Sequence, residues 1–281
     1  MTPGRLVLAA TPIGNVRDAS ERLRDALAES PVIAAEDTRR VRQLASALEV
    51  EIAGRVMSFF EHNEAGRVPQ LLEILKGGTD VLVVTDAGMP SVSDPGYSMV
   101  TACIDAGVKV TCLPGPSAVT TALVLSGLEV DRFCFDGFPP RRPGRRRTWL
   151  AQLREETRTC VFFESPHRLA DTLADAVEVL GPDRRAAVCR ELTKTYEEVI
   201  RGTLGELAER AADGVRGEIV VVVTGASPAE SAEENLAELV VEVEERVAAG
   251  ERLKAACGAV AKRTGLGRND LYAAVLEARS E

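Results

Sequence analysis

The sequence is poor in the residues and motifs that mark several common kinds of site. It has two histidines and six scattered cysteines with no CxxC pair, so we expect reduced thiols and no bound metal. No GxGxxG follows the first predicted strand and no GxxxxGK[ST] is present, which argues against a Rossmann or P-loop nucleotide site. No apolar run approaches the roughly 20 residues that span a bilayer. The apolar run near the N-terminus, LVLAAT, is also too short for a signal peptide, so we expect a cytoplasmic protein.

Positive charge is scarce except in one segment. The formal net charge is −9, yet residues 141–147 read RRPGRRR and contain five arginines. Without these five arginines the net charge would be −14, which is −9 minus 5. Such a run is either a solvated surface loop or the contact surface for an anionic partner, and composition does not decide between the two.

Short apolar segments alternate with amphipathic segments along most of the chain, which is the pattern of an α/β fold. The first part, to about residue 127, predicts a mostly parallel sheet of about five strands. Strand-like segments with shorter links follow it and predict a mixed second sheet. After a predicted linker at 225–235 the pattern is helical. We therefore expect an N-terminal α/β domain at 1–120, a second α/β domain at 121–226 and a C-terminal helical segment at 232–281.

Polar loops rich in Gly and Pro follow the predicted strands of the first part. In an open α/β sheet, ligands bind outside the carboxyl ends of the strands, where these loops lie. Both histidines, His62 and His167, also fall at strand-to-helix junctions, although SPHR equally indicates an ordinary helix start. The sequence thus predicts a ligand site at one rim of the sheet. The loops are TPIGN (11–15), AEDTRR (35–40), FFEHNEAG (59–66), TDAGMPSVSDPG (85–96) and PGPSA (114–118).

A series of long motifs resembles one known family. The chain is similar over residues 5–224 to the ribosomal RNA small subunit methyltransferase I family, a member of the tetrapyrrole-methylase-like class of S-adenosylmethionine enzymes. Met89 and Thr85 stand where Thr and Ser are familiar in that family. The motifs are, in order, ATPIGNVRDAS, AAEDTRRVRQL, EHNE, TDAGMPSVSDPGY, LPGPSAVTTAL, SGLEVDRFCFDGFPPRR, ESPHRL, RELTKTYEEVIRGTL and GEIVVVV.

The resemblance implies a fold and a reaction. It implies two α/β domains with the methyl donor, S-adenosylmethionine, in the cleft between them, and a homodimer. The implied reaction is methylation of the ribose 2′-hydroxyl of a cytidine in the decoding region of 16S rRNA, within the small ribosomal subunit. Carried onto this chain, the donor-binding residues are Pro12, Asp86, Ala87, Gly88, Ser117, Ala118, Arg190, Glu191, Gly217, Glu218 and Ile219.

Catalytic and RNA-binding residues are less sharply indicated. Methyl transfer to a hydroxyl depends on positioning, and an acceptor for the hydroxyl proton assists it. The sequence does not choose among the candidate acceptors, which are Asp37, Glu61, His62 and Glu64. Lys194 or Arg39 is a candidate to hold phosphate or to orient the hydroxyl. The arginine run lies at the predicted domain junction, where it can hold phosphates and so set affinity rather than choice of nucleotide. The predicted RNA-binding residues are Arg39, Arg141, Arg142, Arg145, Arg146, Arg147, His167 and Arg168.

Two other functions fit part of the sequence. A tetrapyrrole C-methyltransferase of the same fold would favour an aromatic-lined trough, whereas only 4% of the residues are aromatic, and the arginine run would have no role. A non-catalytic RNA-binding factor for ribosome assembly would have no use for an intact set of donor-binding loops. The sequence therefore favours an RNA methyltransferase.

Overall fold

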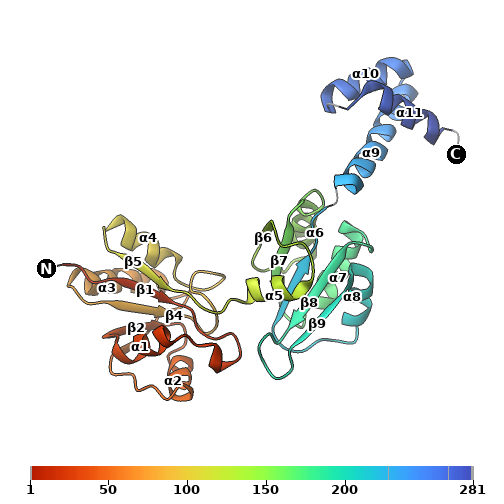
Figure 1. Cartoon of the computed structure of the whole chain (residues 1–281). Coiled ribbons are helices and arrows are strands. Elements are labelled where there is room, and N and C mark those ends of the chain that lie inside the picture. The colour runs from red at the N-terminus through yellow and green to blue at the C-terminus, as the bar shows by residue number, and fades with distance from the viewer. Residues whose placement is uncertain (1, 227, 265, 280–281) are drawn as a thin grey trace. The chain divides into compact units, whose positions relative to one another are not determined.

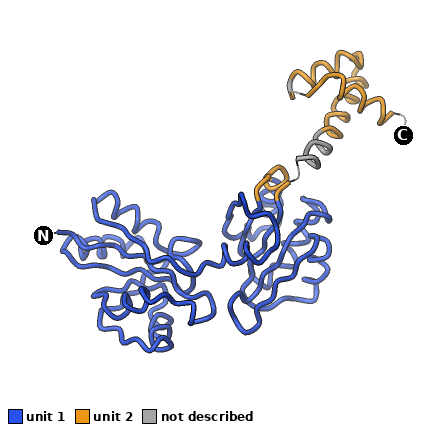
Figure 2. The backbone as a smooth tube through the Cα atoms, viewed as in Figure 1, with its two compact units in different colours: residues 1–151, 159–224 blue, residues 152–158, 225–281 orange. Residues whose placement is uncertain are grey.

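The computed structural model describes residues 2–226, 228–264 and 266–279. The chain divides into two compact units (Figure 2), one made of residues 1–151 and 159–224 and the other of residues 152–158 and 225–281. The first unit contains two five-stranded sheets, and the second contains three helices near the C-terminus (Figure 1).

The first sheet is wholly parallel, with strand order β3-β2-β4-β1-β5. Its central strand β4 is buried along its whole length, as a parallel strand covered on both faces must be. These observations confirm the predicted parallel sheet. The strands are β1 (Leu6–Ala9), β2 (Val32–Ala35), β3 (Arg55–Ser58), β4 (Val81–Val84) and β5 (Val110–Leu113).

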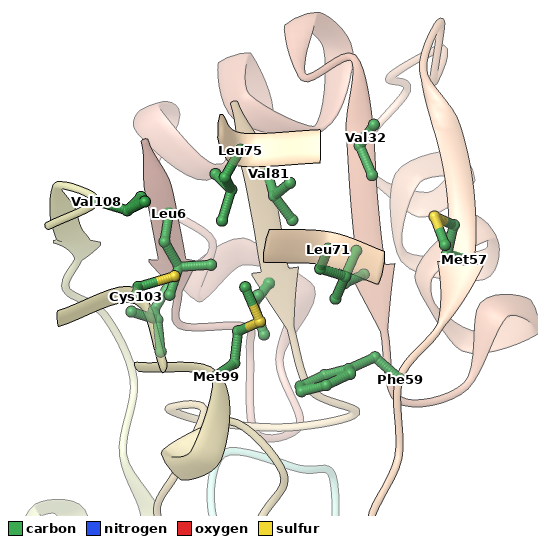
Figure 3. Close-up of a cluster of buried hydrophobic side chains, with 13 residues drawn as sticks. Leu6, Val32, Met57, Phe59, Leu71, Leu75, Val81, Met99, Cys103 and Val108 are labelled. Atoms are coloured by element: carbon green, nitrogen blue, oxygen red, sulfur yellow. The ribbon is translucent and has the colours of Figure 1, made fainter. Parts of the chain in front are cut away.

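Helices cover both faces of this sheet. On one face, Leu71 and Leu75 of α3 (Glu64–Lys76) and Met99 and Cys103 of α4 (Tyr97–Asp105) pack on the strands (Figure 3). On the other face lie α1 (Glu21–Glu29) and α2 (Thr38–Ala47). A short 3-10 helix, η1 (Val16–Asp18), precedes α1 in the chain. The loops that leave the carboxyl ends of the strands are therefore anchored on both sides by buried apolar side chains.

The second sheet is mixed, as predicted, with strand order β6-β7-β10-β8-β9. Only the β6–β7 pair is parallel, and the other three pairs are antiparallel. Helix α5 (Ala118–Ser126) packs on this sheet through Val119, Ala122 and Leu123. The strands are β6 (Phe133–Phe135), β7 (Thr159–Glu164), β8 (Arg185–Arg190), β9 (Glu198–Thr203) and β10 (Ile219–Val223), and the other helices are α6 (Pro143–Gln152), α7 (Leu169–Leu180) and α8 (Leu204–Ala211).

The arginine run is partly helical, which corrects the prediction of a loop. Helix α6 begins at Pro143, so Arg145, Arg146 and Arg147 are helical. Proline is favoured at the first position of a helix, because its fixed φ suits the helix and its missing N–H would be unpaired there anyway. Arginine is a good helix former. Arg145, Arg146 and Arg147 therefore lie on different faces of one helix, whereas Arg141 and Arg142 precede it.

The three C-terminal helices form a small core of their own. They are α9 (Pro228–Ala248), α10 (Leu253–Thr264) and α11 (Arg268–Ala278). Val243, Cys257, Val260, Leu271 and Val275 are fully buried among them. The predicted helical segment is thus present, but the predicted linker at 225–235 is too long, because α9 already begins at Pro228.

The six cysteines lie outside any disulfide, as expected. Cys103, Cys160, Cys189 and Cys257 are buried, whereas Cys112 is exposed. Within the described ranges, no helix combines the length and the apolar character that crossing a bilayer requires.

Candidate functional site

A cavity of about 430 Å³ opens at the carboxyl ends of the first sheet and is closed by residues of the second. This volume falls within the range of roughly 300 to 1,000 Å³ that is typical of sites for small ligands. Its position matches the rim at which open α/β sheets bind ligands. The first sheet contributes Ile13, Glu36, Arg40, residues 86–89 and residues 92–94; later residues add 117–119, Phe138, 163–166, Leu192 and 217–220.

A backbone bridge supports the wall beside β1 and β4. Thr11 and Gly88 form an isolated antiparallel bridge, in which each amide donates to the other's carbonyl at 2.9 and 3.0 Å. The Thr11 hydroxyl also donates to the carbonyl of Thr85 at 3.1 Å. Gly88 has a φ of 78°, a conformation that residues with a Cβ rarely adopt. The loops after β1 and β4 are thereby fastened together beside the cavity.

The opposite wall depends on a second glycine. Gly217 has a φ of 95°, and a Cβ there would collide with the side chain of Glu191. Glu191 Oε1 accepts from the Glu218 amide and from Lys194 Nζ, both at 2.9 Å, and the Lys194 bond lowers the pKa of Glu191. Lys194 Nζ also lies 3.0 Å from Glu218 Oε2. Lys194 is therefore a brace between two carboxylates that hold this wall.

Two acidic side chains of the cavity, Glu36 and Asp86, are tied into the loops beside them. Glu36 Oε2 accepts from the Asp86 amide at 3.1 Å, and Asp86 Oδ1 accepts from the Asp37 amide at 3.2 Å. Asp86 Oδ2 also lies 3.3 Å from Arg40 Nη1. Partial burial raises the pKa of Glu36, although the bond from Asp86 opposes the rise. These carboxylates link the loops after β2 and β4.

Asp94 reaches the same cavity from the loop between β4 and α4. Burial, and then the negative charges of Glu36 and Asp86, raise the pKa of Asp94 to about 7. Within the part of the chain that the structure describes, its carboxylate has no ion-pair or hydrogen-bond partner. Sequence reasoning singled out this loop as a whole but did not select Asp94, because an unpaired carboxylate cannot be told from a paired one in a string of letters.

The backbone of this loop is constrained. Ser91 and Ser93 adopt φ values of 72° and 64°, in the left-handed region that non-glycine residues enter at a cost. The Ser91 amide donates to the Pro95 carbonyl at 3.2 Å, and the Gly96 amide donates to Glu64 Oε1 at 3.1 Å. Glu64, a predicted catalytic residue, thus holds the loop that carries Asp94.

Most of the predicted donor-binding residues meet in this cavity. Pro12 instead lines a smaller adjoining pocket of about 50 Å³. Arg190 and Glu191 stand behind the wall: Arg190 pairs with Glu198 at 2.6 Å and donates to the carbonyl of Arg216. The residues that line the cavity are Asp86, Ala87, Gly88, Ser117, Ala118, Gly217, Glu218 and Ile219.

The remaining predicted catalytic residues lie outside the cavity lining. Asp37 is the N-cap of α2 and accepts from the Arg39 amide and guanidinium, both at 2.8 Å. These bonds hold the pKa of Asp37 well below its usual range, which makes it a weak base. His62 is exposed and contacts the ring edge of Phe60, with ring centroids 6.5 Å apart. These contacts of Asp37 and His62 are structural, and their catalytic roles stay predictions.

The predicted RNA-binding arginines divide into exposed and paired groups. Arg141, Arg142 and Arg145 are exposed, and within the described residues they form no ion pair. Arg146 is buried against Asp175, and Arg147 pairs with Asp175 and Glu178. For Arg146 the prediction needs correction, because a guanidinium that is buried and already paired does not present itself to a phosphate.

The other predicted RNA contacts differ in the same way. Arg39 is 84% exposed even while paired with Asp37, and His167 is exposed. Arg168 instead donates to the carbonyls of Pro139 and Pro140 at 2.8 and 3.2 Å, which holds the segment before the arginine run. It also lies 3.4 Å from Glu164, a fully buried carboxylate that sequence reasoning missed and that accepts from Thr172 at 2.6 Å.

Comparison with known proteins places the chain among methyltransferases. Residues 5–208 match the model of the Tetrapyrrole (Corrin/Porphyrin) Methylases. A relative from Mycobacterium bovis called "Ribosomal RNA small subunit methyltransferase I" is 61% identical, with 100% of this chain and 98% of the relative covered. A relative of the same name from Halalkalibacterium halodurans is 42% identical, with 96% and 93% covered.

Solved structures agree on the fold. Uroporphyrin-III-C-methyltransferase from Thermus thermophilus superposes with a TM-score of 0.56 at 19% identity, covering 79% of this chain and 94% of that chain. A structure of that enzyme complexed with S-adenyl homocysteine gives a TM-score of 0.54 at 17% identity, covering 78% and 96%. Likeness at this identity shows the fold alone. Together with the full-length relatives, it means that the chain belongs to the ribosomal RNA small subunit methyltransferase I family, on the tetrapyrrole methylase fold.

Proposed function

We propose that the protein is an S-adenosylmethionine-dependent methyltransferase of the RNA of the small ribosomal subunit. More narrowly, we propose that it methylates the ribose 2′-hydroxyl of a cytidine in the decoding region of 16S rRNA. The observation that carries the broader proposal is 61% identity over the full chain to a relative named for small-subunit RNA methylation. The cavity at the rim of the first sheet supports it.

The residues of the cavity fit the methyl donor. An adenosyl group with an amino-acid tail needs peptide groups at close range, and the loops around Gly88 and Gly217 offer them because neither residue has a side chain there. A sulfonium is a cation, and the carboxylates of Glu36, Asp86 and Asp94 line the same cavity. When bound, the donor supplies an electrophilic methyl group. The residues that would hold it are Asp86, Ala87, Gly88, Ser117, Ala118, Gly217, Glu218 and Ile219.

The exposed arginines fit a phosphate backbone. Arg141, Arg142 and Arg145 follow the segment of Pro139 and Pro140 that Arg168 fastens, and the cavity-lining Phe138 directly precedes that segment. Guanidinium groups bind phosphate oxygens through paired N–H donors. An otherwise acidic chain disfavours RNA elsewhere, so these arginines would confine contact to one side of the cavity. They would position the strand, while base contacts would select the nucleotide.

Two experiments, donor binding and then methyl transfer, test this proposal. Calorimetry with S-adenosylmethionine comes first. A protein that does not bind the donor would favour the alternative of a non-catalytic RNA-binding assembly factor over this enzyme. Methyl transfer from radiolabelled donor to purified small subunits and to naked 16S rRNA follows, with large subunits as the control. We expect the labelled methyl group to enter the RNA of the small subunit and not the RNA of the large subunit. Incorporation into a porphyrin substrate in place of RNA would favour the tetrapyrrole alternative.

The homodimer that the resemblance implies stays a prediction. Light scattering on the full chain measures it directly, with a mass near twice 30.1 kDa expected.

A further inference from the structure

We infer that Asp94 is the catalytic base that accepts the proton of the attacking ribose hydroxyl. This inference rests on the proposed function and names a residue that lies within the motif TDAGMPSVSDPG but was not selected as a candidate from the sequence. It starts from the cavity, in which the acidic residues are Glu36, Asp86, Asp94, Glu164 and Glu218.

The other carboxylates of the cavity are already engaged. Glu36 and Asp86 hold the amides of the neighbouring loops, at 3.1 and 3.2 Å. Glu164 is fully buried, bonded to Thr172 and to the Ser165 amide. Glu218 is paired with Lys194 at 3.0 Å. Among the described residues that line the cavity, Asp94 is thus the carboxylate left without a protein partner.

Neither histidine competes for the role. His62 and His167 are both exposed, and neither is among the residues that line the cavity. Asp37 caps α2 and is held ionised by Arg39, so its affinity for a proton is low. The cation that lines the cavity, Arg40, has a guanidinium with N–H donors and no acceptor, so it does not serve as a base. Asp94 is therefore the candidate base that remains, because the neighbouring groups are bonded to other residues or do not accept a proton.

The fold holds Asp94 in place for this work. Its loop is fixed at one end by the Gly96 amide on Glu64 and internally by the Ser91 amide on the Pro95 carbonyl. The left-handed conformations of Ser91 and Ser93 turn the loop sharply next to the cavity. Backbone strain of this kind persists where the surrounding structure holds it, and a catalytic carboxylate must be held within a fraction of an ångström.

The charges around Asp94 suit a base that operates near neutral pH. Glu36 faces it from the end of β2 and Asp86 from the end of β4, while Arg40 of α2 is paired with Asp86, and Glu64 of α3 binds the same loop. Burial and the two carboxylates raise its pKa to about 7, close to the value at which a general base is most effective. A bound sulfonium would favour the ionised carboxylate and lower this pKa.

The proposed step balances without another reactant. A lone pair of the ribose O2′ forms the new O–CH3 bond while the S–CH3 bond breaks and its electron pair stays on sulfur. The O2′ proton passes to Asp94, which later releases it to water. The products are the 2′-O-methyl ribose, a neutral thioether and one proton.

Donor binding to the wild-type protein gives a test that does not need turnover. Because the cation lowers the pKa of Asp94, affinity for S-adenosylmethionine should rise between pH 6 and pH 8, about tenfold for each unit of pKa lowered. S-adenosylhomocysteine has the same amino-acid tail but no sulfonium, so its affinity should rise less. Equal pH dependence for the two ligands would overturn the inference, even if no variant folded.

Variants give the second test. Asp94→Asn should flatten the difference between the two ligands and lower kcat by about 10² to 10⁴-fold, with donor affinity at pH 6 within about threefold of wild type. Asp94→Glu, which keeps a carboxylate, should recover part of kcat. The matched control is Asp105→Asn, an exposed acid at the end of α4, which should behave as wild type.

These experiments distinguish the role of Asp94 from the proposed function of the protein. Wild-type kcat in Asp94→Asn, with donor still bound, would overturn the role of Asp94 and leave the proposed function standing. A wild-type protein that binds no donor would overturn both.

Discussion

Arg146 and Asp175 form a buried ion pair, with Arg146 Nη2 2.6 Å from Asp175 Oδ2 and side chains only 5% and 9% exposed. Arg147 shares Asp175 at 3.0 Å from the adjacent position of α6. Two of the five clustered arginines therefore fasten α6 to α7. The other three arginines, Arg141, Arg142 and Arg145, are exposed at the surface.

Breaking the buried pair should destabilise the protein. Arg146→Ala leaves Asp175 buried with one partner instead of two, and we expect a loss on the order of 3 kcal/mol in the free energy of unfolding. The single tryptophan, Trp149, lies on α6 and contacts Phe162 with ring centroids 5.2 Å apart, so its fluorescence reports the docking of this helix. Arg145→Ala is the matched control and should change stability by no more than about 0.5 kcal/mol. Equal stability of the two variants would contradict the structural role of Arg146.

Removing the exposed arginines should affect RNA and not the donor. We expect the triple variant Arg141→Gln, Arg142→Gln, Arg145→Gln to bind a single-stranded 16S rRNA fragment more weakly. Each lost phosphate contact should reduce the slope of log K against log salt by about 0.7, so the total reduction should be about 2. Fluorescence anisotropy over a salt series measures this slope. An unchanged slope would show that these arginines are solvated surface charges that do not contact RNA phosphates.

Adding a single methyl group at Gly217 should damage the donor site. A Cβ at this position meets the side chain of Glu191 and sits on a backbone with a φ of 95°. We expect Gly217→Ala to weaken donor binding about tenfold or more, which calorimetry measures. Gly66→Ala is the matched control, because a Cβ at Gly66 meets nothing within 4 Å and alanine favours the helix α3. Similar affinity in the two variants would show that Glu191 does not brace the cavity.

The Asp37–Arg39 pair should make part of the stability depend on pH. Bonds from Arg39 lower the pKa of Asp37 in the folded state. A carboxyl of this kind stabilises fully above its unfolded pKa and loses the contribution as pH falls through the folded pKa. The gap in Tm between wild type and Asp37→Asn should therefore be widest above about pH 5 and narrow below about pH 4. Arg39→Gln should show a gap of the same shape, whereas a constant gap from pH 3 to pH 7 would contradict the pairing.

Much of the fold was predictable because it follows from local patterns. The buried run Val81–Val84 is apolar throughout and indicates a covered parallel strand from sequence alone. Because ligands bind outside the carboxyl ends of parallel strands, the position of the site at this edge of the sheet was also predictable without knowledge of any contact. Gly88 and Gly217 were placed at the site through the resemblance, and the structure locates both in the lining of one cavity.

What the sequence could not reveal depends on partners far apart in the chain. Arg146 and Arg145 are adjacent and identical in kind, but Asp175 lies 29 positions away and selects only one of them for burial. Asp94 likewise owes its state to Glu36 and Asp86, which other loops bring beside it. Asp37, Glu64 and Lys194 resembled catalytic groups because their bonds to Arg39, Gly96 and Glu191 were invisible.

Mapping a transferred heavy methyl group shows directly which nucleotide and which atom the protein methylates. Small subunits incubated with the protein and trideuteromethyl donor would be digested to nucleosides and analysed by mass spectrometry. We expect a single labelled cytidine in the decoding region, with the label on the ribose fragment after the base is removed. Label on a base, on a porphyrin or on no nucleoside at all would contradict it.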